Sequence, residues 1–248
     1  MEKLVKHLMR LYLMPGMLAP ELLTGRIHGL ETQPVSLANL DGMTRAIVIP
    51  FDPIKHDDEG AHWTRLCECA HVLQTAYGFP APAVSISSGS GYRLWLSLAA
   101  PVASADATRF VRLLWSSCFP ELAQPGADLQ GAIDLAPCRD AGSGRWSAFI
   151  NPGMGASFVG EPGLEMAPPS SAQAAFLEQL ESIEPAEFAA AMATLQAALP
   201  QAAATAAPRS APAASAPGEL LLRDATLEDI VRHLHALHIE PTFRHLLP

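Results

Sequence analysis

Two carboxylates stand at or near the ends of apolar segments, where they could hold a metal ion. Asp52 follows the run IVIPF (47–51) and precedes a polar loop that contains Asp57 and Asp58. A carboxylate at the end of a strand is held by a rigid element and stays in contact with water, which suits a metal ligand. Asp134 lies near the end of a second short apolar run. For Asp52-Pro53, a simple turn is the alternative interpretation.

A turn of small residues could bind phosphate. It consists of Ser88, Gly89, Ser90 and Gly91, and Arg93 and Trp95 follow it. Successive backbone N–H groups in such a turn can surround a phosphate group, and the arginine could add a fork of donors. Trp95 is expected on the same strand face as Arg93, which makes it the candidate for stacking on a base. The alternative is a hairpin turn that needs glycine only for its backbone conformation.

A third polar group surrounds a glycine-containing turn after Asp134. Arg139 and Arg145 flank this turn. An acid with two arginines could contact an anionic ligand, although a surface salt-bridge cluster is equally compatible with the sequence.

Apolar periodicity identifies the elements that must position these residues. A spacing of three and four predicts helices over 2–13, 61–78, 104–119, about 170–183 and about 186–198. Hairpins are expected around Asp41-Gly42 and over 83–100, with short strands at 130–135 and 146–150. Antiparallel strands interleaved with helices predict an α+β fold, with helices packed on a curved antiparallel sheet.

The chain changes character after this region. Fifteen of the residues 197–218 are Ala or Pro, a composition that buries little and predicts a linker between a domain at 1–196 and a segment at 219–248. The last segment has an apolar helical stripe formed by Leu227, Ile230, Leu234 and Leu237. A short helix is marginal alone, so this tethered helix is expected to dock on its own domain or on a protein partner.

Composition narrows the classes of function. The 248 residues carry a net charge of −9, which disfavours binding DNA over the whole surface but leaves room for a local basic groove. The four cysteines show no disulfide or metal-binding spacing, and no secretory signal or membrane span is recognisable. These features predict a cytoplasmic protein without membrane attachment.

The three polar segments together resemble the catalytic core of the archaeo-eukaryotic primase superfamily, which includes primase-polymerases and plasmid replication primases. The matching pieces are IPFDP, SGSGYRLW and AIDLAP, within residues 45–150. They occur in the family's order, with 41 residues from Asp52 to Arg93 and 41 from Arg93 to Asp134. The resemblance implies an RRM-like core with a ligand cleft.

Two departures from the family pattern affect the expected activity. Pro50 stands where the family has the first carboxylate of its metal-binding Asp-x-Asp motif, and Arg93 stands where it has a nucleotide-contacting histidine. The resemblance therefore implies a degenerate, non-catalytic protein of replication or of a mobile element, which binds a nucleotide or single-stranded DNA or recruits a partner. The alternative is an active primase-type nucleotidyltransferase in which Asp52 and Asp134 hold Mg or Mn.

Overall fold

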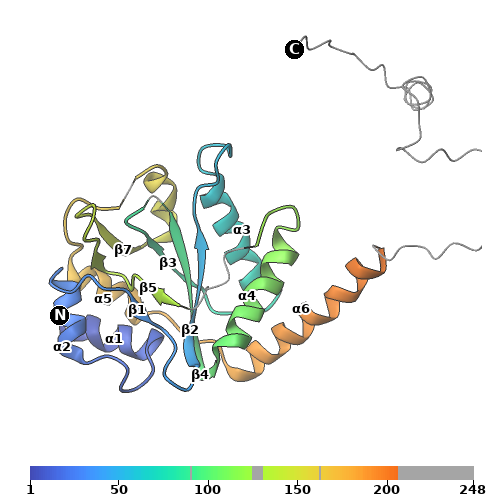
Figure 1. Ribbon diagram of the computed structural model, residues 1–248, viewed down its shortest axis with the longest axis horizontal. Helices are drawn as coiled ribbons and strands as arrows, with labels where there is room; N and C mark the ends of the chain where they lie inside the picture. Colours follow the sequence, from blue (N-terminus) through green and yellow to red (C-terminus); the bar gives the residue numbers. More distant parts are fainter. Residues whose placement is uncertain (90, 125–130, 162, 206–248) are drawn as a thin grey trace, which may run out of the picture. The chain divides into compact units, whose positions relative to one another are not determined.

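The computed structural model describes residues 1–89, 91–124, 131–161 and 163–205 (Figure 1). The chain divides into two units, Met1–Thr205 and Ala206–Pro248, of which only the first contains described residues. The segment expected at 219–248, with Leu227, Ile230, Leu234 and Leu237, lies outside the described residues and stays a prediction. The first unit ends later than the expected boundary at 196, because the last helix continues to Thr205. None of the helices in the described ranges has the length and apolar character needed to span a bilayer.

A five-stranded antiparallel sheet forms the centre of the first unit, and it confirms the α+β class. Its strands are β2 (Met43–Phe51), β3 (Ala83–Ile86), β4 (Tyr92–Ala103), β6 (Cys138–Arg139) and β7 (Trp146–Ile150). Their order in the sheet is β2-β4-β3-β7-β6, so β2 and β6 lie at opposite edges.

Strict alternation of side chains along β4 divides the core into two clusters. Tyr92, Leu94 and Leu96 belong to one cluster, whereas Trp95 belongs to the other. This is the period of two that the sequence predicts for a strand covered on both faces. The apolar residues of the pattern are then removed from water, which is the main favourable contribution to folding.

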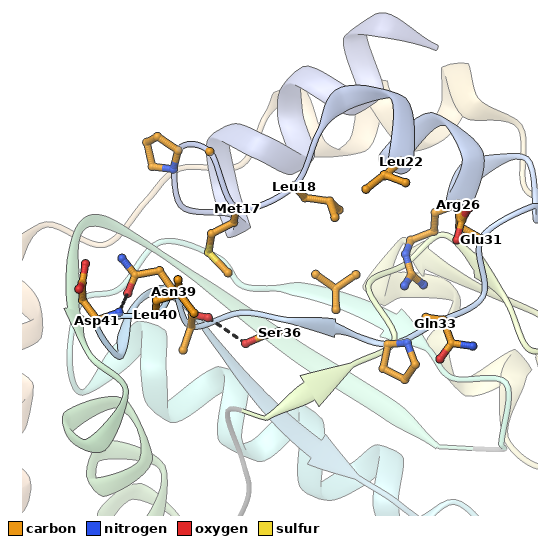
Figure 2. Close-up of a pocket in the computed structure, with 15 residues that line it drawn as sticks. Met17, Leu18, Leu22, Arg26, Glu31, Gln33, Ser36, Asn39, Leu40 and Asp41 are labelled. Atoms are coloured by element: carbon orange, nitrogen blue, oxygen red, sulfur yellow. Dashed lines mark hydrogen bonds between the residues drawn. The ribbon is translucent and has the colours of Figure 1, made fainter.

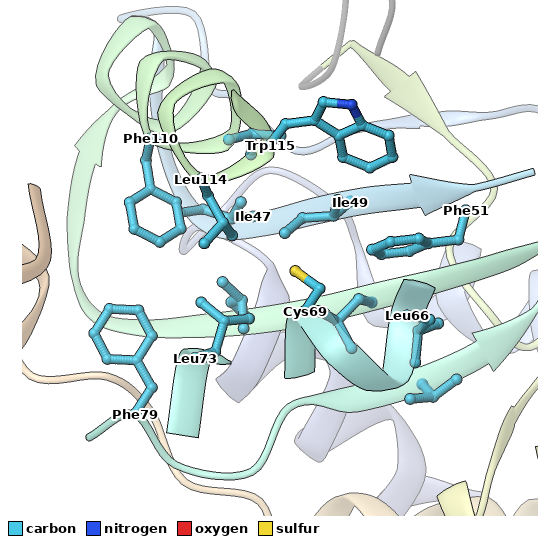
Figure 3. Close-up of a cluster of buried hydrophobic side chains, with 14 of the residues drawn as sticks. Ile47, Ile49, Phe51, Leu66, Cys69, Leu73, Phe79, Phe110, Leu114 and Trp115 are labelled. Atoms are coloured by element: carbon cyan, nitrogen blue, oxygen red, sulfur yellow. The ribbon is translucent and has the colours of Figure 1, made fainter. Parts of the chain in front are cut away.

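Helices cover both faces of the sheet (Figure 1). The first cluster contains side chains of α3 (Ala61–Thr75), α4 (Ser104–Cys118) and α6 (Pro185–Thr205). Figure 3 shows Leu66, Cys69 and Leu73 of α3 directed toward the β2 and α4 side chains. The second cluster contains side chains of α1 (Glu2–Tyr12), α2 (Pro20–Ile27) and α5 (Ser170–Glu178). A 3₁₀ helix, η1 (Pro152–Phe158), follows β7.

Arg10 joins the first helix to a distant part of the chain. Its guanidinium donates to the backbone carbonyl of Leu177 at 3.0 Å and to that of Leu180 at 3.2 Å. These carbonyls lie at the end of α5, where a helix leaves its last C=O groups without intrahelical partners. The side chain therefore caps α5 while the apolar stripe of α1 covers the sheet.

The hairpin expected around Asp41-Gly42 is only partly correct. The turn forms, since Asn39 Oδ1 accepts from the Met43 N–H at 2.8 Å and Gly42 has a φ of +72°. The segment before it makes a single antiparallel bridge with β2, between Ala38 and Thr44, and does not continue along β2. Instead β1 (Val35–Ser36) pairs antiparallel with β5 (Ala132–Ile133) in a separate two-stranded sheet. The sequence predicted the turn correctly, because its signal is local. It did not predict the partner of β1, because β5 is distant in the sequence.

The RRM-like core implied by the resemblance is not reproduced in its strand order. The elements β2, α3, β3, β4, α4 and β7 follow the β-α-β-β-α-β chain order of such folds. An RRM-like sheet places its last strand beside its first. Here β7 pairs with β3, so the last strand lies on the other side of the sheet from β2.

Candidate functional site

Asp52 and Arg93 lie together at the end of the sheet where β2 terminates. Arg93 Nη1 donates to Asp52 Oδ1 at 2.6 Å and to the Tyr92 carbonyl at 2.9 Å. The Asp52 side chain is 56% exposed and that of Arg93 is 25% exposed. The structure thus brings these two predicted site residues into one partly exposed ion pair. Water screens such a pair, so it contributes about 1 kcal/mol or less to stability.

The small-residue turn between β3 and β4 is closed on itself. Ser87 Oγ accepts from the N–H of Gly91 at 3.0 Å and from that of Gly89 at 3.3 Å. Two amides expected to face phosphate therefore donate to Ser87 instead. A Cβ on Gly91 would overlap the Asp52 carboxylate, so a side chain here would displace Asp52 from its position beside Arg93. Ser88 is half-buried beside these glycines, and Ser90 lies outside the described residues.

Trp95 does not stack on a ligand, and that prediction is wrong. Its side chain is 1% exposed, and its indole Nε1 donates to Ser85 Oγ at 2.8 Å. The rings of Tyr12 and Phe149 lie 5.0 and 5.6 Å from it, centroid to centroid. Because α1 covers this face of β4, Trp95 and Ser97 are buried, whereas Arg93, at the sheet end, stays in contact with water.

Asp134 is exposed and is not positioned on the sheet that carries Asp52. It follows β5, whose partner is β1. Its charge contributes to raising the pKa of Cys138, the first residue of β6, which is the edge strand opposite β2. In the described ranges no three His, Cys, Asp or Glu side chains form a group that could hold a metal.

Arg139 and Arg145 lie at the β6 edge, and their contacts are local. Arg139 Nε donates to the Gly144 carbonyl at 3.1 Å, and Arg145 Nη2 lies 3.6 Å from Glu165 Oε1. Within the same turn, donation from the Ser143 N–H and hydroxyl lowers the pKa of Asp140. These contacts fit the surface-cluster interpretation and place both arginines away from β2.

Sequence reasoning missed an aromatic group that supports the Asp52–Arg93 end. Tyr92 Oη donates to the Gly155 carbonyl of η1 at 2.8 Å. The ring of His62, at the start of α3, stacks on Tyr92 with 5.2 Å between centroids, and Trp63 also contacts it. The only sequence signal for this aromatic group was the position of His62, at the start of the helix that follows the polar loop.

His62 is a buried titratable group beside this end of the sheet. It is 5% exposed, and its Nε2 has no hydrogen-bond partner in the part of the chain that the structure describes. Burial lowers the pKa of His62, and the nearby Arg65 lowers it further, whereas Asp52 and Asp57 oppose the shift. The imidazole is therefore favoured in its neutral form. Asp57 is itself paired with Arg65 at 2.6 Å.

A second feature missed from the sequence is Arg26, whose side chain faces a cavity of about 630 Å³ beside α2. No motif pointed to it, because a single arginine in a short helix carries no pattern. Comparisons with known proteins add no family to these observations. A scan against protein-family models gave no match, and a search of curated proteins gave none.

Proposed function

We propose that the chain is a non-catalytic, primase-like accessory protein of replication or of a mobile element. Its ligand is phosphate-bearing, a nucleotide or single-stranded DNA, and binds beside Arg93. The observation that carries this proposal is the 2.6 Å pair between Arg93 and Asp52. A carboxylate that the resemblance assigns to metal binding is here already paired with a fixed cation.

The guanidinium of Arg93 retains capacity for a ligand. Its bonds to Asp52 and to the Tyr92 carbonyl both start from Nη1. Among the described residues, Nε and Nη2 have no hydrogen-bond partner. Arginine has five N–H donors in a planar fork that matches phosphate oxygens, so three remain for an anion. This supports phosphate binding by an arginine in place of a metal.

The alternative, a metal-dependent nucleotidyltransferase, needs its carboxylates together. A two-metal site stabilises attacking and leaving oxygens through several ligands on one centre. Pro50 supplies no ligand, and Asp134 follows a strand of the other sheet. This arrangement favours the binding function over the catalytic one.

The substitution Asp52→Asn distinguishes the two functions, because they predict opposite changes in ligand affinity. Asp52→Asn removes the internal counter-ion of Arg93, so the binding function expects tighter association with nucleotide and labelled single-stranded DNA. Fluorescence anisotropy at low and moderate salt measures it, since phosphate contacts weaken as salt rises. Arg93→Gln should weaken binding, while Arg112→Gln, at an exposed position of α4, should leave it unchanged.

The opposite results would support catalysis. If Asp52→Asn weakened binding as much as Arg93→Gln, the arginine-centred site would be wrong. Manganese-dependent nucleotide incorporation that disappeared in both Asp52→Ala and Asp134→Ala would establish the enzyme.

The stripe Leu227, Ile230, Leu234 and Leu237 carries a second part of the proposal, recruitment of a protein partner. Its support is the sequence pattern after the Ala/Pro-rich segment. Truncation after Gly218 should abolish partner recovery and leave the melting temperature of the remaining protein unchanged. An equal loss of stability would mean that the stripe belongs to the domain core.

A further inference from the structure

A cavity of about 630 Å³ lies between α2 and the segment 33–41 (Figure 2). Small-molecule sites typically measure roughly 300–1,000 Å³, so its size suits a metabolite-sized ligand. None of its lining residues belongs to the Asp52–Arg93 end of the sheet. The cavity is therefore a separate site, and a ligand bound there is independent of the function proposed for Arg93.

Arg26 is the cation of this cavity. Its side chain is 3% exposed, and Nη1 has no hydrogen-bond partner among the described residues. Within the described ranges it also forms no ion pair. Figure 2 shows its guanidinium directed from α2 toward the space above β1. On its other side it lies against Cys138, whose pKa is raised by burial and lowered by both the charge of Arg26 and a side-chain hydrogen bond with it.

A buried guanidinium without a counter-ion is unfavourable, and arginine cannot relieve the cost by losing its proton. Buried charges in proteins are paired for this reason. The helix α2 nevertheless keeps the side chain in place rather than letting it extend into water. An anion that enters the cavity would supply the missing partner, once a small shift of the guanidinium exposes Nη1, which has almost no accessible surface.

The remaining lining sets the shape and charge of that anion. Its apolar part consists of Met17, Leu18, Leu22, Val35 and Leu40. Two exposed carboxylates, Glu31 and Asp41, also line the cavity. They repel a multiply charged headgroup more strongly than a single charge. A single negative charge attached to an apolar chain therefore fits best.

We propose that this cavity binds an aliphatic monocarboxylate, with the carboxylate on Arg26 and the hydrocarbon chain against Leu18, Leu22 and Leu40. The planar fork of arginine matches the two carboxylate oxygens, and the apolar chain leaves water as it enters.

Calorimetric titration of the full chain with decanoate tests the proposal, with 1-decanol, acetate and decyl phosphate as comparison ligands. Decanoate should bind at least about tenfold more tightly than each of the others, because an arginine–carboxylate bond in a desolvated site is worth about that factor. Arg26→Met should remove this preference, while Arg112→Met on the exposed face of α4 should keep it.

Equal affinity for decanoate in Arg26→Met and in the parent protein would overturn the proposal. So would equal affinity of the parent for decanoate and 1-decanol, a comparison that stays decisive if the variant does not fold. Tighter binding of decyl phosphate than of decanoate would replace the monocarboxylate by a phosphate ligand and refute the assignment.

Discussion

Arg93 and Arg26 show two opposite ways of placing a cation in one domain. Arg93 is 25% exposed at its side chain and pairs with Asp52, so its charge is neutralised within the chain and screened by water. Arg26 is 3% exposed and has no counter-ion among the described residues. An anion at Arg93 must compete with Asp52 and with solvent, whereas an anion at Arg26 meets little solvent but shares the cavity with the carboxylates of Glu31 and Asp41.

A recognisable sequence pattern and a preorganised binding group therefore need not coincide in one protein. The Asp52–Arg93 end carries the family resemblance, yet its two charged side chains are already paired with each other. The cavity beside α2 carries no motif, yet it places a buried charge without a counter-ion next to an open apolar pocket. Substitutions in and around both regions can break or refine this contrast.

Trp95→Ala should produce the largest loss of stability. Its ring is enclosed by Tyr12 and Phe149, so truncation leaves a cavity and costs about 3–5 kcal/mol. Chemical denaturation measures the loss. Nucleotide affinity per folded molecule should stay unchanged, because the indole faces the core. A selective loss of affinity with little loss of stability would show that Trp95 contacts the ligand after all.

Gly155→Ala should destabilise the Arg93 end without affecting the cavity. The added methyl group would overlap the indole of Trp63, and the displaced backbone would weaken the bond from Tyr92 Oη. A cost of about 1–3 kcal/mol is expected for such overpacking. Gly89→Ala is the control, since a Cβ there meets nothing within 4 Å. Similar melting temperatures for both variants would show that the η1 contact does not support this end.

Replacing each arginine by methionine should shift stability in opposite directions. Arg26→Met exchanges an unpaired buried charge for an apolar chain and should raise the free energy of unfolding by about 1 kcal/mol or more. Arg93→Met breaks an exposed pair and should lower it by about 0.5 kcal/mol. Denaturant titrations without ligand measure both. A loss in Arg26→Met would mean that its charge is already compensated.

Acid sensitivity from His62 should be the weakest of these effects. Because burial lowers its pKa in the folded protein below the ordinary 6.5, the unfolded chain binds a proton first as pH falls. Stability should therefore be unaffected by this group above about pH 6.5 and should decline below it, by at most about 1.4 kcal/mol per pH unit. His62→Gln should flatten the decline. His7 shifts in the same direction, so His7→Gln measures its separate share.

The helices and main strands were predictable because their signals are local. The stripe of α1, the alternation along β4 and the apolar faces of α3 and α4 each follow from neighbours in the sequence. The helix α2 was missed because it has only eight residues and contains Gly25, although Pro20 at its first turn is a typical start signal.

The resemblance predicted that Asp52 and Arg93 belong to one site, but not that they pair with each other. Their contact depends on β2 and β4 being adjacent antiparallel strands. The positions of Asp134 and Trp95 did not follow, because they depend on which sheet β5 joins and on which helix covers β4. The role of Arg26 could not be predicted for the same reason, because the burial of a charge without a partner is known only once the chain is packed.

The bond from Arg10 to the end of α5 has a consequence for the order in which the domain is made. Arg10 and Leu177 are 167 residues apart, so α1 leaves the ribosome long before its partner exists. At about 5–20 residues per second, the apolar stripe of α1 waits roughly 8–33 s for α5. During that interval the part of the stripe that packs on α5 has no partner, although β2 and β4 emerge earlier and can cover the rest. The newly made chain should therefore be a chaperone client until residue 180 emerges, and moving α1 behind α5 by circular permutation should shorten that dependence.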